Sequence, residues 1–330
     1  MKESRNSFRR WIGPAAAIGA GLAAFYMVAR TRRKAAEVRE SHFEPNWELD
    51  ERSEVVDGVR MHWLEHGHGT PIVLIHGIPT SPLLWRKVMP RLRHAKVYAW
   101  EMVGYGGSSG EGEGRDISVA KQADYLAAWL RHMGIGTVVL AGHDLGGGVV
   151  QIVAARHPAL CSGLFLVDAI CYDSWPIPTV TAVRAMRMVV ERMPAVVIRP
   201  MLELLLRRGH GNRKVMRESA ALHLRNYREP GAGRALARQV GSLDVRDTLD
   251  VQERLPHLRI PTRVVWGALD PFQKPRYGER LAHDLGTRVV WISGGRHFIP
   301  EDRPSEVADA LNDLLREVEA EAARDIGASA

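Results

Sequence analysis

The sequence predicts an α/β fold, in which a mostly parallel sheet is covered by helices on both faces and carries an inserted helical cap. Three features lead to this prediction. The turn dipeptide Asp57-Gly58 separates two strand-like runs, short apolar runs then alternate with longer amphipathic ones, and this alternation stops between residues 170 and 256. A chain of 330 residues with 45% hydrophobic residues can bury a large core, so a disordered protein is not expected.

The expected strands begin with a hairpin. Runs 53–56 and 60–65 flank Asp57-Gly58, which favours a type I′ turn because both turn positions need a positive φ. Further strands are expected at 72–75, 97–100, 138–141, 164–167, 263–266 and 289–292. Apolar runs of this length with helices between them are typical of a parallel sheet buried on both faces.

The expected helices lie between these strands, at 82–93, 117–133, 147–157, 276–285 and 304–320. Residues 170–256 hold no convincing strand but several Met-, Leu- and Val-rich helical stretches, such as 183–208. We therefore expect a core at 53–169 and 257–320, a helical cap at 170–256 and a tail at 321–330. The Met-rich faces of the cap are interpreted as packing surfaces, with membrane docking as the alternative.

Residues 11–29 form an uncharged hydrophobic stretch of 19 residues. As a helix this stretch would be about 28 Å long, close to the thickness of a bilayer core. Basic residues lie on both sides of it: Arg9, Arg10, Arg30, Arg32, Arg33 and Lys34. This double flank favours a retained membrane anchor at 1–34, followed by a polar tether at 35–52. The alternative is a cleaved twin-arginine export signal, because the chain reads Arg9-Arg10-Trp11-Ile12.

Charge placement and residue spacing argue against several other classes of protein. Of the formal net charge of +7, residues 1–40 carry +6, from nine Lys/Arg and three Glu, which favours a membrane or targeting role over nucleic-acid binding. Cys161 and Cys171 belong to no Cys-x-x-Cys pair and are expected to be buried free thiols. His66 and His68 resemble a turn rather than a metal site, and neither a metal nor a cofactor is expected.

The strongest chemical motif is Gly142-His143-Asp144-Leu145-Gly146-Gly147, which lies between an expected strand and an expected helix. Small residues two positions before and after the central one allow a tight strand-to-helix turn, which holds the central side chain out over the edge of the sheet. Here that side chain is the carboxylate of Asp144. At a helix N-terminus, free N–H groups and the helix dipole would keep it ionised. Asp144 is therefore the candidate nucleophile.

This motif resembles the nucleophile turn of the α/β-hydrolase superfamily, and in particular its branch with an aspartate nucleophile: epoxide hydrolases, haloalkane dehalogenases and fluoroacetate dehalogenases. Other matching motifs are His76-Gly77-Ile78-Pro79, Trp85-Arg86, Gly104-Tyr105-Gly106-Gly107-Ser108 and Trp266-Gly267-Ala268-Leu269-Asp270. The resemblance covers residues 53–320 and is weakest in the cap. It implies an oxyanion hole formed by the backbone N–H groups of Ile78 and Leu145.

The resemblance also implies roles for His297 and Asp270, which follow the last two expected strands. A carboxylate nucleophile attacks an sp³ carbon and leaves an alkyl ester on the enzyme. His297 would activate the water that cleaves this ester, and Asp270 would orient and balance the imidazole. The order nucleophile, acid, histidine along the chain fits the fold. Asp168 and Asp173, which follow the 164–167 strand, remain rival candidates for the acid.

The substrate class is inferred by comparing this chain with the substrate-binding residues of the three families. Haloalkane dehalogenases usually hold the halide with an asparagine and a tryptophan, and this chain has Ile78 and Leu145 at those positions. Fluoroacetate dehalogenases usually have an arginine beside the nucleophile, where this chain again has Leu145. Epoxide hydrolases support the epoxide oxygen with cap tyrosines, a role for which Tyr227 is the better candidate and Tyr172 the second. Trp175 is a candidate for substrate binding, as a donor to the leaving group through its indole N–H, and a packed hinge is the favoured alternative.

The resulting expectation is the hydrolysis of a small apolar epoxide to a diol through an ester on Asp144. One alternative is a haloalkane or haloacid dehalogenase with a non-standard halide site. Another is a non-catalytic protein of the same fold that binds a lipophilic ligand. Hydrolases of esters or C–C bonds are disfavoured because they usually keep a serine at the position of Asp144. A membrane contact through residues 11–29 would suit a lipophilic substrate.

Overall fold

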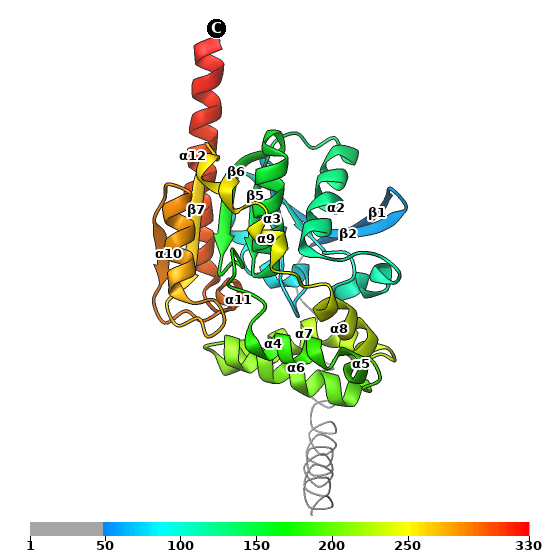
Figure 1. Cartoon of the computed structure of the whole chain (residues 1–330). Coiled ribbons are helices and arrows are strands. Elements are labelled where there is room, and N and C mark those ends of the chain that lie inside the picture. The colour runs from blue at the N-terminus through cyan, green and yellow to red at the C-terminus, as the bar shows by residue number, and fades with distance from the viewer. Residues whose placement is uncertain (1–48, 330) are drawn as a thin grey trace, which may run out of the picture. The chain divides into compact units, whose positions relative to one another are not determined.

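The centre of the molecule is an eight-stranded sheet with the order β1-β2-β4-β3-β5-β6-β7-β8. The computed structural model describes residues 49–329, so the predicted anchor or signal at 1–34 lies outside the described residues. β2 is antiparallel to both of its neighbours, and all other neighbouring strands are parallel (Figure 1). The strands are β1 (Asp50–Val56), β2 (Val59–His66), β3 (Thr70–Ile75), β4 (Ala95–Trp100), β5 (Val138–His143), β6 (Cys161–Val167), β7 (Thr262–Gly267) and β8 (Val289–Ile292).

Each strand-like run of the sequence lies within one of these strands, which confirms the predicted α/β sheet. The hairpin prediction is also confirmed, because β1 and β2 pair around Asp57 and Gly58, whose φ angles are 49° and 75°. These positive values are those that a type I′ turn requires.

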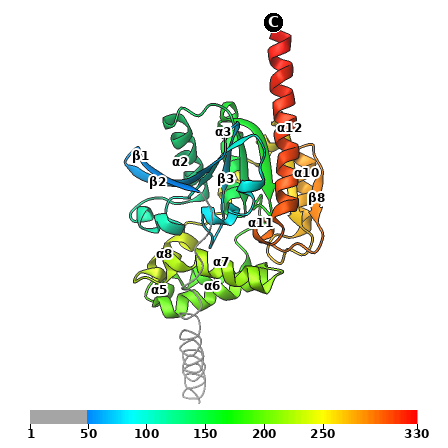
Figure 2. The same cartoon turned by 180° about the vertical axis from the view of Figure 1, so that it is seen from behind.

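Helices cover both faces of the sheet (Figure 2). They are α2 (Val119–His132), α3 (Leu145–Arg156), α10 (Pro275–Asp284), α11 (Ile299–Asp302) and α12 (Pro304–Ser329). Alternate side chains of β3 point to opposite faces: Val73 and Ile75 pack with α2, α3 and α10, whereas Ile72 and Leu74 pack with α12. The continuous apolar runs of the sequence are explained by this burial on both faces.

The structure differs from three of the predictions, one helix and two boundaries. The expected helix at 82–93 is instead a pair of 3₁₀ turns, η2 (Pro82–Trp85) and η3 (Met89–Arg91). Pro90 provides no N–H group and disfavours the helical conformation of the residue before it, which interrupts the helix. β1 begins at Asp50, inside the predicted tether, and α12 continues to Ser329, through the predicted tail.

The cap consists of α4 (Pro178–Ala185), α5 (Arg187–Val190), α6 (Ala195–Gly209), α7 (Arg213–His223), the 3₁₀ turn η6 (Arg225–Tyr227) and α8 (Ala232–Gly241). These elements lie together on one side of the core (Figure 1). α9 (Arg246–Leu249) and η7 (Gln252–His257) pack against α3, although the sequence placed them in the cap. In residues 49–329, no helix combines the length and the apolar composition that a membrane span needs.

A buried carboxylate fixes the loop that follows β4. Glu101 accepts hydrogen bonds from the backbone N–H of Gly107 (2.8 Å) and from the hydroxyl of Ser108 (2.7 Å) in η4 (Gly106–Gly112). Burial raises the pKa of the Glu101 carboxyl from 4.5 to about 7, although both hydrogen bonds favour its ionised form. The folded protein therefore favours the protonated form of the Glu101 carboxyl more than the unfolded chain does.

We expect the stability of the protein to fall relative to that of Glu101→Gln as the pH rises from 4.5 to 7, and the difference to stay constant above pH 7. In this window the unfolded chain releases the Glu101 proton while the folded chain retains it, which corresponds to a loss of about 3–4 kcal/mol. Urea unfolding at several pH values would measure the effect, with the exposed Glu113→Gln as the control. Parallel curves for the two proteins would contradict the assignment.

Candidate active site

Asp144 occupies a sharp turn between β5 and α3. Its φ of 52° and ψ of −118° are unusual for a residue other than glycine. A Cβ atom on Gly142 would lie 2.2 Å from the carbonyl oxygen of Gly146, and one on Gly146 would lie 2.4 Å from that of Ile75. These backbone contacts explain why the motif needs glycines, and they hold Asp144 at the carboxyl end of β5.

The two oxygens of the Asp144 carboxylate have different surroundings. Oδ1 accepts a hydrogen bond of 3.1 Å from the backbone N–H of Ile78, whereas Oδ2 lies 3.6 Å from Nε2 of His297. Burial would raise the pKa of Asp144, but His297 and the N–H of Leu145 outweigh it and lower that pKa. The carboxylate is therefore ionised, with one oxygen held by a backbone donor and the other free to attack.

His297 lies between two carboxylates. Its Nδ1 is 2.8 Å from Oδ2 of Asp270, whose Oδ1 accepts hydrogen bonds from the N–H groups of Phe272 (2.7 Å) and Gln273 (3.1 Å). Burial would lower the pKa of His297, but Asp270 and Asp144 hold it well above its usual value. The free site therefore contains an imidazolium between two negative charges.

The structure gives the two rival acids different positions. Asp168 accepts a 2.7 Å hydrogen bond from the N–H of Gly267, and burial together with the charge of Asp270 raises its pKa far above the usual value. The raised pKa favours the neutral form of Asp168, and it is Asp270 rather than Asp168 that contacts Nδ1 of His297. Asp173 is exposed, and its carbonyl oxygen accepts a hydrogen bond from Tyr277, so it lies on the surface rather than against His297.

Within the described residues, His143, Asp168 and His297 are the one group close enough to hold a metal ion, with possible ligand atoms within 4.8 Å of one another. Their chemistry does not suit a cation. Burial raises the pKa of Asp168, which favours its neutral form, and the carboxylates of Asp270 and Asp144 raise the pKa of His297, which favours an imidazolium that cannot bind a cation. Nε2 of His143 is already 2.9 Å from the carbonyl oxygen of His297. We interpret the group as a support for the backbone and charge of His297.

A small cavity opens beside Asp144 and His297, with a volume of about 40 Å³. Core residues and cap residues line it together: Ile78, Leu145, Ile170, Trp175, Pro176, Ile177, Val180, Leu205, Leu243, Phe272, Gln273 and Phe298. Most of these side chains are apolar, which agrees with an apolar substrate. The volume has room for little more than a water molecule or two, so a larger substrate requires the cap to move.

The polar groups of the three predicted cap residues are all engaged elsewhere. The hydroxyl of Tyr227 donates to Oε1 of Gln239 (2.7 Å), and that of Tyr172 donates to Asp284 (2.7 Å). Neither tyrosine is among the cavity-lining residues. The ring of Trp175 lines the cavity, but its indole N–H donates to Thr248 (2.7 Å). The predicted oxygen-supporting role of Tyr227 and Tyr172 is therefore not available in this arrangement.

Gln273 is a cavity residue that the sequence interpretation missed. Apart from Asp144 and His297, it has the one polar side chain among the lining residues. It is 2% exposed, and its side-chain oxygen Oε1 has no hydrogen-bond partner among the described residues. A signal did exist, because Gln273 follows Asp270 by three residues in the loop after β7, where functional side chains of this fold gather.

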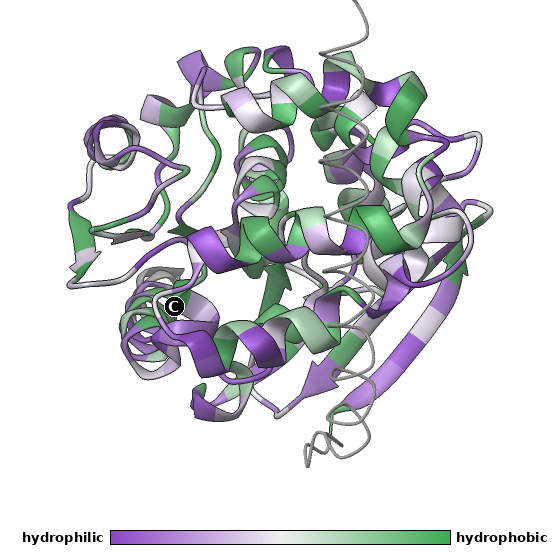
Figure 3. Ribbon diagram, turned by 90° about the horizontal axis from the view of Figure 1, so that it is seen from below, coloured by the Kyte–Doolittle hydropathy of each residue, from purple (hydrophilic) through white to green (hydrophobic). Residues whose placement is uncertain are grey.

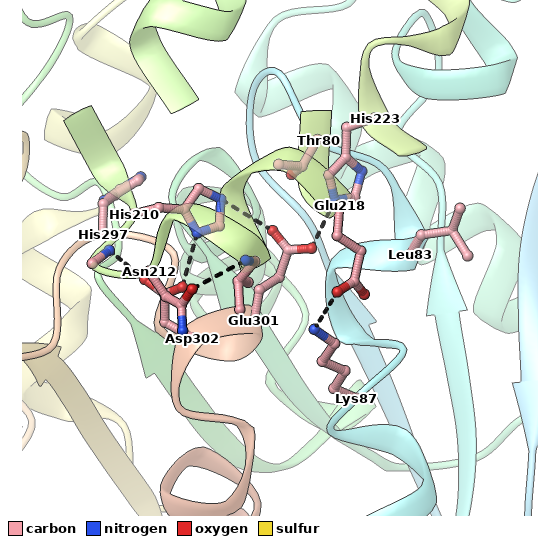
Figure 4. Close-up of polar contacts among 12 residues, drawn as sticks. Thr80, Leu83, Lys87, His210, Asn212, Glu218, His223, His297, Glu301 and Asp302 are labelled. Carbon is pink, nitrogen blue, oxygen red and sulfur yellow. Dashed lines mark hydrogen bonds and ion pairs between the residues drawn. The ribbon is translucent and has the colours of Figure 1, made fainter. Parts of the chain in front are cut away.

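Charged residues join the cap to the core next to His297. We call Arg86, Glu301, Asp302, His210, His223 and Glu218 the cap–core cluster. Figure 4 shows Glu301 between His210 and His223, at distances of 3.4 Å and 3.3 Å. Arg86 pairs with Glu301 of the core and with Glu218 of α7.

The cluster is linked to the active site through Phe298. The ring of His210 stacks on that of Phe298 with centroids 4.7 Å apart, and the N–H groups of Glu301 and Asp302 donate to the carbonyl oxygen of Phe298. Because Phe298 directly follows His297, the cluster positions the histidine as well as the cap.

Comparison with known proteins gives the family of this chain. Residues 70–304 match the family described as alpha/beta hydrolase fold. A soluble epoxide hydrolase of Corynebacterium sp. (strain C12) is 27% identical over 289 residues, which cover 79% of this chain and 96% of that protein. A haloalkane dehalogenase of Sphingobium indicum is 26% identical over 302 residues, covering 79% of this chain and 93% of that protein.

Solved structures lead to the same fold. The structure of the epoxide hydrolase CorEH without ligand superposes with a TM-score of 0.65 and 25% identity, covering 82% of this chain and all of that one. An esterase from Thermogutta terrifontis gives a TM-score of 0.68 with 22% identity over 82% of this chain and 99% of that one. The chain is thus similar to hydrolases that act on different bonds.

Proposed function

The chain belongs to the alpha/beta hydrolase fold family, and we propose that it is a hydrolase that works through an alkyl ester on Asp144 and opens epoxides to diols. The observation that carries this proposal is the position of the carboxylate. Oδ1 is held by the N–H of Ile78, while Oδ2 lies beside His297 at a distance too long for a strong hydrogen bond. A nucleophile held in this way is ready to attack a carbon atom.

In the first step, Oδ2 of Asp144 attacks a carbon of the epoxide and forms a C–O bond. The C–O bond of the ring breaks, and the leaving oxygen stays on the neighbouring carbon and takes up the proton that the imidazolium of His297 gives up. Asp144 loses its charge in this step. The carboxylate that helped to hold the pKa of His297 high has then become a neutral ester, so the imidazolium can give up its proton.

In the second step, neutral His297 takes a proton from water, and the hydroxide attacks Cγ of Asp144. Negative charge develops on Oδ1, which already contacts the backbone N–H of Ile78. Asp270 stabilises the imidazolium that forms. Collapse of the intermediate releases the diol, which carries away the original Oδ2, and restores the carboxylate of Asp144.

Epoxide opening is preferred to halide displacement because of the side chains around the cavity. The positions after His76-Gly77 and after Asp144 hold Ile78 and Leu145, which offer a departing halide no side-chain donor. The side chain of Gln273 lines the cavity, and its amide nitrogen can instead donate a hydrogen bond to the oxygen of a substrate, whereas the atom without a partner is the acceptor Oε1. The similarities to an epoxide hydrolase and to a haloalkane dehalogenase each cover 79% of this chain, so the preference rests on these side chains.

We expect Gln273→Leu to lower kcat/KM for an epoxide by about 10- to 100-fold, which corresponds to the loss of one hydrogen bond in the transition state. The change also removes a buried amide oxygen without a partner, so thermal stability should not fall. Tyr227→Phe is the matched comparison and should change the rate less than about threefold, because its hydroxyl bonds Gln239. A severe loss in Tyr227→Phe with normal rates in Gln273→Leu would reverse the assignment.

A single turnover in ¹⁸O-labelled water tests the proposed ester. The full-length enzyme, in excess, is mixed with a small apolar epoxide, and the diol and the Asp144 peptide are weighed. We expect an unlabelled diol and one ¹⁸O atom in Asp144. A labelled diol with unlabelled Asp144 would show direct attack by water and overturn the proposal. If the enzyme converts a matched chloroalkane but not the epoxide, the reaction is dehalogenation rather than epoxide hydrolysis.

We further propose that residues 11–29 anchor the protein in a membrane, because this uncharged stretch has basic residues on both sides. The anchored chain should stay with membranes after a carbonate wash and keep its N-terminal sequence. A soluble product that begins beyond residue 29 would favour the export signal instead.

A further inference from the structure

The cap exposes an unusual share of apolar surface. Of the seven large hydrophobic side chains exposed in residues 49–324, four belong to the cap: Met186, Met188, Val189 and Leu204, with exposed fractions of 53–67%. They lie on or beside α5 and α6, which form the edge of the cap farthest from the sheet (Figure 1). The predicted packing role of the Met-rich faces does not account for these four residues.

Met188 and Val189 are exposed although α5 is firmly packed against the rest of the cap. Val190, on the inner side of α5, is 2% exposed. α8 approaches this turn so closely that a Cβ atom on Gly233 would lie 2.4 Å from the carbonyl oxygen of Val190 and 2.5 Å from that of Met193. α5 therefore cannot rotate to bury Met188 and Val189 without losing this contact.

α6 divides its two sides in a similar way. Leu202 and Leu206 are buried and Leu205 lines the active-site cavity, whereas Leu204 faces solvent. Figure 3, viewed from the cap side, shows hydrophobic and hydrophilic residues alternating along the cap helices. The outer surface of α6 is thus separated from the active site by one helix.

Charge is strongly divided between cap and core. Residues 178–241 hold thirteen Lys/Arg and four Asp/Glu, a formal charge of +9. The rest of residues 49–330 holds 23 Lys/Arg and 29 Asp/Glu, a charge of −6. Around the apolar residues, the exposed arginines Arg187, Arg192, Arg207 and Arg208 outnumber the exposed acids Glu191 and Glu203. A basic surface that surrounds exposed aliphatic side chains favours an anionic and partly apolar partner.

We propose that α5 and the outer side of α6 dock on a bilayer that contains anionic lipids. The four aliphatic side chains enter the boundary between headgroups and acyl chains, and the arginines bind lipid phosphates. A second copy of the chain is disfavoured because a symmetric contact would bring two +9 surfaces together. Nucleic acid is disfavoured because the exposed side chains are aliphatic and give bases no ring to stack on.

Docking at this surface would place the cavity beneath α6 close to the lipid. A lipophilic substrate could then pass from the bilayer to Asp144 when the cap moves. This contact is separate from any anchoring by residues 11–29 and from the chemistry of the active site, so each can be tested without the others.

A fluorescent probe at residue 188 tests the docking. Cys161 and Cys171 are buried, so Met188→Cys in the full-length chain can be labelled selectively with an environment-sensitive dye. Val55→Cys, an exposed apolar position on β1, provides the reference. Vesicles of phosphatidylcholine alone serve as the control, because residues 11–29 can anchor the chain in them. Vesicles that also contain phosphatidylglycerol add the negative charge that the proposed docking requires.

We expect a blue shift of the probe at residue 188 with phosphatidylglycerol only, weakened by high salt, and no shift at residue 55. Arg187→Glu with Arg192→Glu should weaken vesicle binding by at least about thirtyfold. Arg60→Glu with Arg131→Glu, exposed changes on the core, should leave it unchanged.

The proposal would be overturned by no shift at residue 188 while the protein pellets with anionic vesicles, by equal shifts at residues 188 and 55, or by an equal shift with double-stranded DNA in place of vesicles. A shift that depends on protein concentration without vesicles would identify a second copy as the partner and would overturn it as well.

Discussion

Replacement of His297 by glutamine is expected to stop the enzyme after one chemical event and to leave the substrate attached to Asp144. Glutamine fills a similar space but cannot accept the proton of the attacking water. Attack by Asp144 itself needs no base, and water can protonate the leaving oxygen in place of His297, so the first step continues. Steady-state turnover should fall by about 10⁴-fold or more, a loss comparable to that of other members of catalytic triads.

The trapped ester can be weighed on the Asp144 peptide. An epoxide adds its whole mass, whereas a haloalkane adds its alkyl group without the halogen, so the adduct identifies the leaving group. Asp144→Asn should show no adduct and no turnover. An adduct on another residue, or a folded His297→Gln variant that turns over at the normal rate, would contradict the proposed roles.

The nucleophile turn could be predicted from sequence because its requirements are local. A Cβ atom on Gly142 or Gly146 would lie within 2.4 Å of a backbone oxygen, so only glycine fits at these two positions. This requirement appears in the sequence as glycines at a fixed distance from Asp144. The roles of Asp270 and His297 followed from the resemblance to the α/β-hydrolase superfamily, and their positions after strands of a parallel sheet are compatible with one shared edge. Local rules therefore predicted the turn at Asp144, and the resemblance predicted its two partners.

The cap tyrosines could not be placed by such rules. Tyr227 lies in a 3₁₀ turn between two cap helices, and its hydroxyl direction depends on the packing of α8, which supplies Gln239. Tyr172 has a φ of 47° after β6, and its hydroxyl reaches Asp284 of α10. A hydroxyl group in an irregular segment bonds whichever partner the tertiary fold supplies, and the spacing of residues does not record that choice.

The charge of the cap illustrates a different difficulty. The residues after position 40 carry only +1, which gave no reason to look for a basic surface. This small sum conceals a cap of +9 and an acidic core, because opposite charges cancel in a count along the chain. The boundaries of the cap helices had to be known before the two parts could be counted separately.

Glu301→Gln is expected to destabilise the protein by about 3–5 kcal/mol, because it leaves Arg86 buried without its nearest full negative charge. Both side chains are completely buried. Burial would raise the pKa of Glu301, but Arg86 and then His223 outweigh it and hold that pKa far below 4.5. The stabilisation is therefore present above pH 4.5 and should shrink as the pH falls through the lowered value of the folded protein.

Urea unfolding at pH 7 and at progressively lower pH would measure this loss. Glu306→Gln provides the matched control, because Glu306 pairs with Arg303 at the surface of α12 and should contribute less than about 0.5 kcal/mol. The double variant Arg86→Met with Glu301→Leu should unfold at higher urea than Glu301→Leu alone, since it removes both buried charges.

A cap-specific consequence distinguishes the cluster from an ordinary core ion pair. His210 and His223 reach Glu301 from the cap, so Glu301→Gln should make the cap segment sensitive to protease before the core unfolds. The same loosening would release Phe298 from His210 and shift His297. Equal urea midpoints for Glu301→Gln and Glu306→Gln would show that the cluster does not hold the cap on the core.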